Sequence, residues 1–356
     1  MARAGLLSVV LGIAYSGMAQ AGDTTTLYGR LNVAVESTRG PVSMKRLSNN
    51  RSVLGFKGEE DLGDGLKAIW QLEGALSLDT GAGSVTNRNT RIGLAGPLGT
   101  LFAGVWTLPY TEATSAFDPF YPTTAGYMAL IGNGSASNAD NVTDRSAFDR
   151  RQQNVVQYWT PALGAVHARL AYSFGEGVVP GTGATPSLAS ASLSWDSTDL
   201  SIVSAFELHR HYQTATTSDR AGKLGASYQW GPVRLSGLVE RLEYGSAEGR
   251  LARNAWYVSA VWRNDRTSVV GGYSKAGPGK GPTNARVGSI AAGPDTGATQ
   301  LTLGAEYSLS RRLVLYGYGS RIQNEKNGHY EFALNPLGLE RGGRGTVWAA
   351  GLRYAF

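Results

Sequence analysis

Cysteine is absent from this sequence of 356 residues. Its absence excludes disulfide-stapled scaffolds, structural zinc sites with cysteine ligands and cysteine-bound iron–sulfur clusters. Charged residues are also few, at 17% of the chain, against a usual value of about 25%. After residue 21 there is no run of about 18 consecutive apolar residues, so the sequence predicts no transmembrane helix in that part.

Glycine and aromatic residues are plentiful instead. The chain has 48 Gly, 17 Tyr and 8 Trp, and its formal net charge is +6. Abundant aromatic and apolar residues argue against disorder. The length by itself fits two soluble domains or one large β-barrel, so the pattern along the chain has to decide between them.

The first 21 residues have the pattern of an export signal. Arg3 provides a positive start, an apolar stretch runs from Ala4 to Met18, and Ala19-Gln20-Ala21 forms an A-x-A cleavage site. We therefore expect residues 1–21 to be a signal peptide and residues 22–356 to form the mature protein. The alternative is an amphipathic first helix.

Apolar and polar residues alternate with a period of two through most of the remaining chain, which is the pattern of half-buried β-strands. In the last run, Trp348, Ala350, Leu352, Tyr354 and Phe356 share one face. Sixteen such runs are predicted, at residues 24–38, 48–60, 64–79, 87–96, 99–109, 149–160, 164–175, 187–196, 199–210, 220–230, 232–245, 251–263, 266–276, 297–309, 312–325 and 346–356.

The connections between these runs alternate between short and long. Tight turns rich in Gly, Pro, Asn and Asp alternate with long links near 39–47, 80–86, 110–148, 176–186, 211–219, 246–250, 277–296 and 326–343. An even number of antiparallel strands with this alternation is typical of an outer-membrane barrel, whose closed sheet leaves no unpaired backbone edge in lipid. A soluble sandwich also alternates, but it does not need so many long strands. We therefore predict an all-β fold, a 16-stranded antiparallel transmembrane β-barrel.

Four segments resemble a known family. Thr26-Leu27-Tyr28-Gly29-Arg30 resembles the opening strand of Gram-negative general porins. Leu54-Gly55-Phe56-Lys57-Gly58 and the residues up to Glu73 resemble their second hairpin nearly residue by residue, and Asn87–Gly99 resembles the next hairpin. Gly351–Phe356 resembles the closing strand with its terminal Phe. The resemblance extends from Gly22 to Phe356 and is strongest for the β-proteobacterial branch. It implies a homotrimer of water-filled barrels, each narrowed by an inward-folded third loop that faces a ladder of basic residues.

The resemblance also assigns site residues position by position. Arg30, Arg91 and Arg151 match the basic ladder, and Glu73 matches a carboxylate beside it. Alternation along the predicted strands independently places the three arginines on lumen-facing positions. Arg91 lies near the middle of its strand, so we expect it to contribute most to the field in the pore.

The third loop corresponds to residues 110–148, where Asp118 is the candidate for the acidic face opposite the ladder. Two positions depart from the family pattern. Val53 stands where the family usually has an arginine, and Arg51, two residues earlier, is expected to replace it in part. The Gly-Arg-Gln that the family tends to carry after the fourth turn is replaced by Gly104-Val105-Trp106, and the usual Pro-Glu-Phe-Gly of the third loop is missing.

We predict a general diffusion porin of the cell outer membrane that prefers anions, because arginine-lined walls concentrate counter-ions. The expected partners are small anions and hydrophilic solutes, outer-membrane lipid and lipopolysaccharide, and the barrel insertion machinery through Phe356. No nucleic-acid partner, cofactor, metal site or enzymatic activity is predicted. His209 and His211 are interpreted as solvated loop histidines rather than a metal pair. The alternatives are a substrate-specific channel of the same fold, and a barrel that serves as an adhesin or enzyme.

Overall fold

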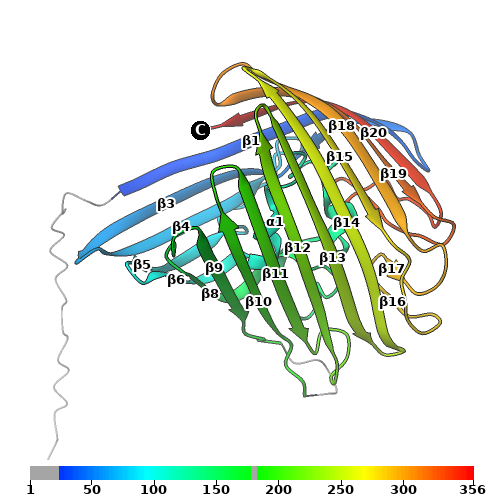
Figure 1. Ribbon diagram of the computed structural model, residues 1–356, viewed down its shortest axis with the longest axis horizontal. Helices are drawn as coiled ribbons and strands as arrows, with labels where there is room; N and C mark the ends of the chain where they lie inside the picture. The colour runs from blue at the N-terminus through cyan, green and yellow to red at the C-terminus, as the bar shows by residue number, and fades with distance from the viewer. Residues whose placement is uncertain (1–23, 178–182) are drawn as a thin grey trace, which may run out of the picture.

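The computed structural model describes residues 24–177 and 183–356. These residues form one ring of long antiparallel β-strands, with a segment of the chain folded inside it (Figure 1). The predicted signal peptide, residues 1–21, lies outside the described residues. Among the described residues, no helix has the length and apolar character needed to cross a membrane.

The wall of the ring follows the chain in sequence order, and pairing of β1 with β20 closes it. Because β2 and β3 both pair with β1, they are two halves of one wall strand. The described residues thus build 16 wall strands, which confirms the predicted fold class. The wall elements are β1 (Thr24–Arg39), β2 (Met44–Asn49), β3 (Ser52–Gly63), β4 (Leu66–Leu76), β5 (Thr90–Gly96), β6 (Gly99–Thr107), β8 (Asp149–Trp159), β9 (Val166–Ser173), β10 (Ser187–Asp196), β11 (Leu200–Arg210), β12 (Ser218–Trp230), β13 (Val233–Ser246), β14 (Gly249–Asn264), β15 (Thr267–Ala276), β18 (Ala298–Ser308), β19 (Leu313–Asn324) and β20 (Arg344–Ala355).

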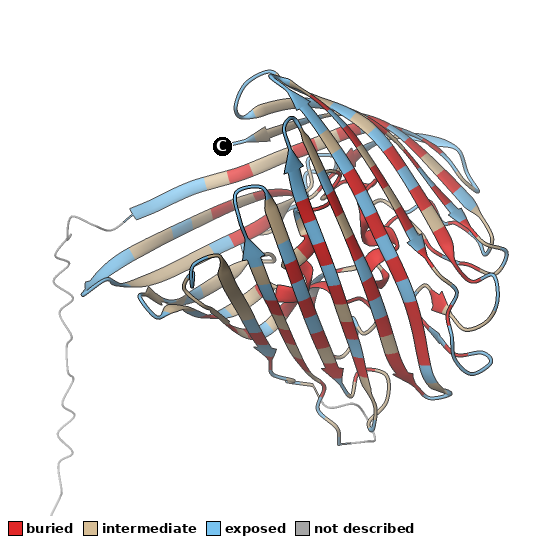
Figure 2. Ribbon diagram, in the orientation of Figure 1, coloured by how far each residue is buried: buried red, intermediate tan, exposed pale blue. Residues whose placement is uncertain are grey.

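Buried and exposed residues alternate along many wall strands (Figure 2), as expected when successive side chains point in turn to the lumen and to the outer surface. On β5, Ile92 is 72% exposed on the outer surface, whereas its neighbour Arg91 points inward onto the buried rings of Phe102 and Trp106. Large apolar residues such as Leu27 and Trp348 are also exposed on the outside. An outward apolar band of this kind is expected where lipid, not water, surrounds the barrel.

The two ends of the barrel differ in their connections. We call the end with the turns β3–β4, β5–β6, β8–β9, β10–β11, β12–β13, β14–β15 and β18–β19 the short-turn end, and the opposite end the long-loop end. Two predicted long links are wrong. The link predicted at 39–47 is reduced to residues 40–43, because β1 and β2 pair from Thr38 and Met44 onward. Residues 246–250 form a tight turn in which Ser246 pairs with Gly249, because β13 and β14 extend farther than the alternation indicated. The long link 277–297 contains a small hairpin of β16 (Arg286–Val287) and β17 (Ile290–Ala291).

The longest connection, residues 108–148 between β6 and β8, folds into the barrel, and we call it the inward loop. Helix α1 (Pro109–Ser115) begins at Pro109. The pyrrolidine ring of proline fixes φ at a helical value, and the first helical position needs no backbone N–H donor. The short 3₁₀ turns η1 (Tyr127–Ala129) and η2 (Ile131–Asn133) follow. Strand β7 (Ser135–Ala139) then pairs in parallel with β8 and returns the chain to the wall.

Candidate functional site

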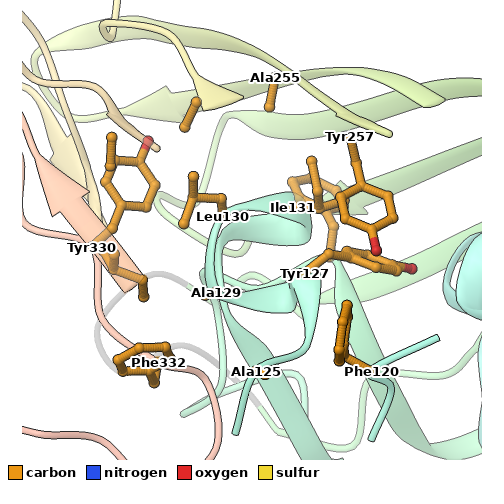
Figure 3. Close-up of a cluster of buried hydrophobic side chains, with 14 of the residues drawn as sticks. Phe120, Ala125, Tyr127, Ala129, Leu130, Ile131, Ala255, Tyr257, Tyr330 and Phe332 are labelled. Atoms are coloured by element: carbon orange, nitrogen blue, oxygen red, sulfur yellow. The ribbon is translucent and has the colours of Figure 1, made fainter. Parts of the chain in front are cut away.

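The inward loop packs against one side of the barrel wall. The opposite side of the wall faces the loop across the lumen. Its residues Phe120, Tyr127, Leu130 and Ile131 belong to one buried apolar cluster with Tyr257 of β14 and with Phe332 of the last long link (Figure 3). Burial of this much apolar and aromatic surface fixes the loop inside the lumen. The loop is therefore a rigid partition, and the opposite wall carries the charged groups described below.

Glu240 on β13 holds the root of the inward loop. Its carboxylate accepts hydrogen bonds from the Tyr110 hydroxyl at 2.9 Å and from the Gly132 backbone N–H at 3.0 Å. Arg253 on β14 lies 3.2 Å from the same carboxylate, and both charged side chains are fully buried. A buried carboxylate is retained when it is paired and hydrogen-bonded in this way, so the contact fixes the loop to the wall.

Asp118 also anchors the loop, and this corrects the expectation that it faces the arginines. Its side chain is only 4% exposed. It accepts hydrogen bonds from the backbone N–H groups of Phe120 and Tyr127, and from the Tyr257 hydroxyl of β14 at 2.9 Å. Burial raises the pKa of Asp118 to about 6, although these three hydrogen bonds oppose the shift. The carboxylate points toward the wall because three donors converge there, whereas no residue spacing in the sequence reveals that convergence.

Opposite the loop, four arginines gather on neighbouring elements, and we call Arg30, Arg51, Arg88 and Arg151 the arginine cluster. Arg51 lies between β2 and β3 with φ of 53°, a left-handed conformation that breaks the strand in two. Its guanidinium donates to the Tyr121 hydroxyl at 2.9 Å and to Ser135 Oγ at 2.6 Å, both on the inward loop. Arg51 therefore spans from the wall to the loop.

The other members surround Arg51 with little compensating negative charge. Arg30 Nη2 donates to the Arg51 carbonyl at 3.0 Å, and Arg151 lies within electrostatic range of both Arg51 and Arg88. Glu73 is the carboxylate beside the cluster, 3.0 Å from Arg88 Nε and 3.0 Å from the Tyr28 hydroxyl. Asp149, buried at the start of β8, lies within electrostatic range of Arg51. Four guanidinium groups thus meet two carboxylates, and the cluster keeps a net positive charge.

Arg151 is placed by its contacts and not by alternation. The pairing register between β6 and β8 shifts between Gly104 and Trp106, and Asn154 has φ of 53°. A β-bulge of this kind interrupts the regular alternation of faces. The Nε atom of Arg151 donates to Asn89 Oδ1 at 2.6 Å, which brings its charge to the cluster.

Arg91 lies apart from the arginine cluster. It pairs in register with Gln71, which is two residues nearer the short-turn end than Glu73. Its guanidinium stacks 4.3 Å from the Trp106 ring centre, and the Phe102 and Trp159 rings flank it. Trp106 is one of the residues that depart from the family pattern, and it supplies the nearest ring. Arg91 is thus a lumen-side residue held by aromatic rings. It lies nearer the short-turn end than the contacts between Arg51 and the inward loop.

Val53 lies directly opposite Arg30 in the β1–β3 register, on the lumen side of the wall. It is buried, so an apolar side chain fills the position at which the family usually has a cation. Arg51 lies next to this gap and reaches the loop from the break in the strand. That Arg51 replaces the missing arginine in part stays a prediction.

Three contact residues of the inward loop were not identified from the sequence. Tyr121 and Ser135 accept the Arg51 hydrogen bonds, and Glu112 forms an ion pair with Arg169 of β9. Burial raises the pKa of Glu112, and the charge of Arg169 opposes that rise. The loop has no periodic pattern, so nothing in the sequence distinguishes these residues from their neighbours.

Two remaining expectations concern His209 and Phe356. His209 is fully buried, stacked between Phe148 and Tyr212 and 2.8 Å from Glu207, so its interpretation as a solvated loop residue is wrong. The described residues contain no group of three or more side chains arranged to hold a metal ion. Phe356 exchanges backbone hydrogen bonds with Gly29 at the closure of the barrel.

Comparisons with known proteins agree with this architecture. A family model described as Gram-negative porin matches residues 7–327. Outer membrane porin protein 32 of Delftia acidovorans is 27% identical over 361 residues, which cover 97% of each chain. Major outer membrane protein P.IA of Neisseria meningitidis is 50% identical over 76 residues, 21% of this chain and 19% of that protein.

Solved structures show the same fold. An anion-selective porin from Comamonas acidovorans superimposes with a TM-score of 0.79 and 25% identity, covering 94% of this chain and all of that one. Salmonella typhi OmpF has a TM-score of 0.70 at 13% identity, with coverage of 94% and 98%.

Proposed function

This chain belongs to the Gram-negative porin family, and from that premise we propose that its arginine cluster makes the pore prefer anions. The chain is an outer-membrane β-barrel with the diffusion function of a general porin. Its relatives are channels and not enzymes. The observation that carries the proposal is the imbalance of charge opposite the inward loop, where Arg30, Arg51, Arg88 and Arg151 meet two carboxylates, Glu73 and the buried Asp149.

The physical basis is electrostatic focusing in a narrow, low-dielectric passage. Cationic walls raise the local concentration of anions and exclude cations. The loop does not cancel this field, because Asp118 is turned toward β14 and Glu112 is paired with Arg169. Guanidinium groups stay charged at physiological pH, so the preference does not depend on their titration. The similarity to a porin described as anion-selective supports the same conclusion.

The charge of Arg51 is the sharpest test of this proposal. Arg51→Gln removes one unit of charge, and two unit charges about 8 Å apart interact by roughly 2 kcal/mol at an effective dielectric near 20. We expect the anion-to-cation ratio, measured as the zero-current potential of a planar bilayer in a salt gradient, to fall several-fold at low salt. Near 1 M salt, where the Debye length is about 3 Å, the difference should shrink.

Two further variants separate charge from loop position. Arg51→Lys keeps the charge without the two-pronged contact, and it should retain most of the wild-type potential. Arg39→Gln removes a charge from the exposed end of β1 and should leave the potential nearly unchanged. A wild-type channel without anion preference would overturn the proposal.

The assembly is also a proposal. We infer that the protein is a homotrimer in contact with outer-membrane lipid and lipopolysaccharide, and that Phe356 serves as the signal to the barrel insertion machinery. The trimer rests on the similarity to trimeric porins, and the insertion signal rests on the terminal position of Phe356 in an outward aromatic face with Tyr354.

A further inference from the structure

A second group of arginines lines the lumen on the short-turn side of the inward loop. Arg234 of β13, Arg263 of β14 and Arg353 of β20 border a hollow of about 380 Å³. The roof of the hollow is formed by the inward loop, including Phe117 and Tyr121. Arg234 and Arg263 lie on strands distant from the arginine cluster, whereas Arg353 lies on β20, which pairs with the β1 strand that carries Arg30.

The wall orients two of these guanidinium groups in the same way. Arg234 Nε donates to Ser227 Oγ at 2.8 Å, and Arg263 Nε donates to Ser268 Oγ at 3.3 Å. Neither arginine forms an ion pair with any residue in the described ranges 24–177 and 183–356, and their terminal nitrogens have no hydrogen-bond acceptor there. Each side chain is therefore anchored through Nε, while the two-pronged end that recognises oxyanions stays available.

The two arginines occupy neighbouring positions on the same face of the wall. Arg234 lies opposite Val261 in the β13–β14 register, so Arg263 is its diagonal neighbour on the same face. Diagonal positions of this kind are about 7–8 Å apart. This distance separates the backbone positions, from which both side chains extend into the same hollow. Two guanidinium groups so placed can each pair with one carboxylate of a dianion, whereas a monovalent anion offers one charge to share between them.

The local charge has the right sign and size for such a ligand. Arg353 pairs with Glu306 at 3.0 Å, so three cations in the hollow meet one carboxylate. Gln229, Ser236 and Ser268 add polar groups to the lining. Arg353 also lies within electrostatic range of Arg30, which connects the hollow with the arginine cluster beyond the loop.

The part of the inward loop that covers the hollow is fixed to β14 by hydrogen bonds at Phe117 and Asp118. Ser259 of β14 donates to the Phe117 carbonyl at 2.6 Å, one residue before Asp118 and its bond to Tyr257. The hollow is thus bounded by rigid elements on the wall side and the loop side, which is the condition for a binding site with defined geometry.

We propose that this hollow is a second anion site, built for dicarboxylates, where a solute that has passed the arginine cluster binds before it leaves the barrel. The inference rests on the proposed anion-preferring channel, because the cluster is what admits such solutes. It adds a ligand class to the channel: dianions bind by bridging Arg234 and Arg263, and monovalent anions pass without being held.

Succinate is the probe for the test, with acetate as the monovalent comparison. Chloride current through single channels is recorded in a planar bilayer at low salt while each probe is titrated. For the wild type we expect succinate, but not acetate, to reduce the current along a saturating curve. Replacing both arginines, Arg234→Gln with Arg263→Gln, should raise the half-blocking succinate concentration about tenfold or more, since two charged hydrogen-bonding partners are lost.

Matched variants separate a shaped site from general charge. Arg311→Gln removes one arginine charge from an exposed short turn and should leave succinate block within about twofold of the wild type. Replacing the pair by lysine keeps both charges but not the planar fork, and it should weaken succinate block while the zero-current potential is retained. Folding of each variant is checked by its shift in gel mobility on heating.

The possible results distinguish this site from the proposed function. Loss of succinate block in the glutamine pair, with anion preference intact, supports the second site. Unchanged block in that pair, equal effects of Arg311→Gln, or no saturating block in the wild type would overturn the site while the anion-preferring channel stands. Absence of anion preference in the wild type would instead contradict the proposed function itself.

Discussion

Arg51 illustrates how one residue positions a charge in this barrel. Its left-handed backbone separates β2 from β3 and turns the side chain toward the inward loop, where Tyr121 and Ser135 accept its hydrogen bonds. A regular strand residue at this point would project directly into the lumen without reaching the loop. The local break therefore places a fixed cation at a contact between the wall and the inward loop.

Asp118 is a residue whose protonation should affect stability. The pKa of its buried carboxyl is about 6 in the folded protein, above the ordinary value of 3.8 expected in the unfolded chain. The folded state thus binds this proton more tightly, so the stabilisation is fully present below about pH 4 and is lost as pH rises through about 6. The change amounts to at most about 3 kcal/mol.

This pH dependence can be isolated with Asp118→Asn, whose side chain does not titrate. We expect the free energy of unfolding of detergent-refolded wild type, measured with urea between pH 4 and 7, to decrease with pH relative to the variant. The difference between the two curves reports on Asp118 alone, because all other titrating groups are shared. Parallel curves across this range would contradict the raised pKa.

At the scale of elements, the inward loop depends on buried contacts with β13 and β14. Glu240→Gln removes the charge that pairs with Arg253 and weakens the acceptor of the Tyr110 hydroxyl. Breaking one partner of a buried ion pair costs about 3–5 kcal/mol. We expect a lower urea midpoint and more open-channel current noise, because the root of the loop loses its attachment to the wall.

Glu243→Gln provides the control on the same strand. Glu243 pairs with Arg220, Arg241 and Arg250, whose side chains are about half exposed on the outer surface. Exposed pairs contribute roughly 0–1 kcal/mol, so this variant should keep the wild-type midpoint and noise. Equal behaviour of the two variants would show that Glu240 does not hold the loop.

At the scale of the whole molecule, closure of the barrel joins the two ends of the chain. The Phe356 and Gly29 backbones exchange hydrogen bonds of 3.1 and 3.0 Å. The Phe356 ring also covers Gly29, where an added Cβ would lie 2.5 Å from a ring atom. The last residue therefore lies on the outer face of the closing pair, next to Tyr354.

Deleting Phe356 tests its proposed role in insertion. We expect the truncated chain to give much less trimer in outer-membrane fractions, seen as the slowly migrating band of unheated samples. When the truncated protein is refolded in detergent, the loss of folded trimer should be smaller, because the remaining β1–β20 pairing is long. Phe356→Tyr keeps a terminal aromatic ring and should insert normally. Normal trimer levels in the deletion variant would contradict the proposal that Phe356 is the insertion signal.

The period-two alternation, together with alternating short and long connections, was sufficient to predict the closed wall. The runs predicted at 187–196 and 199–210 coincide closely with β10 and β11, because the pleat of a strand assigns each side chain to one face. Alternation also placed Arg30 and Arg91 on the lumen side. For Arg151 alternation is not the reason for its position, because the bulge between β6 and β8 interrupts the period, although the side chain does reach the arginine cluster.

The tertiary structure alone decided how the inward loop uses its residues. Asp118 binds Tyr257, and Tyr110 binds Glu240, across 139 and 130 residues of sequence. Such partners meet only after the strands between them have formed the wall, so no local pattern encodes them. The wall follows from the sequence because each strand is specified by its own residues. The orientation of the charged side chains on the loop is decided only in the closed barrel, because their partners lie on strands that are distant in the sequence.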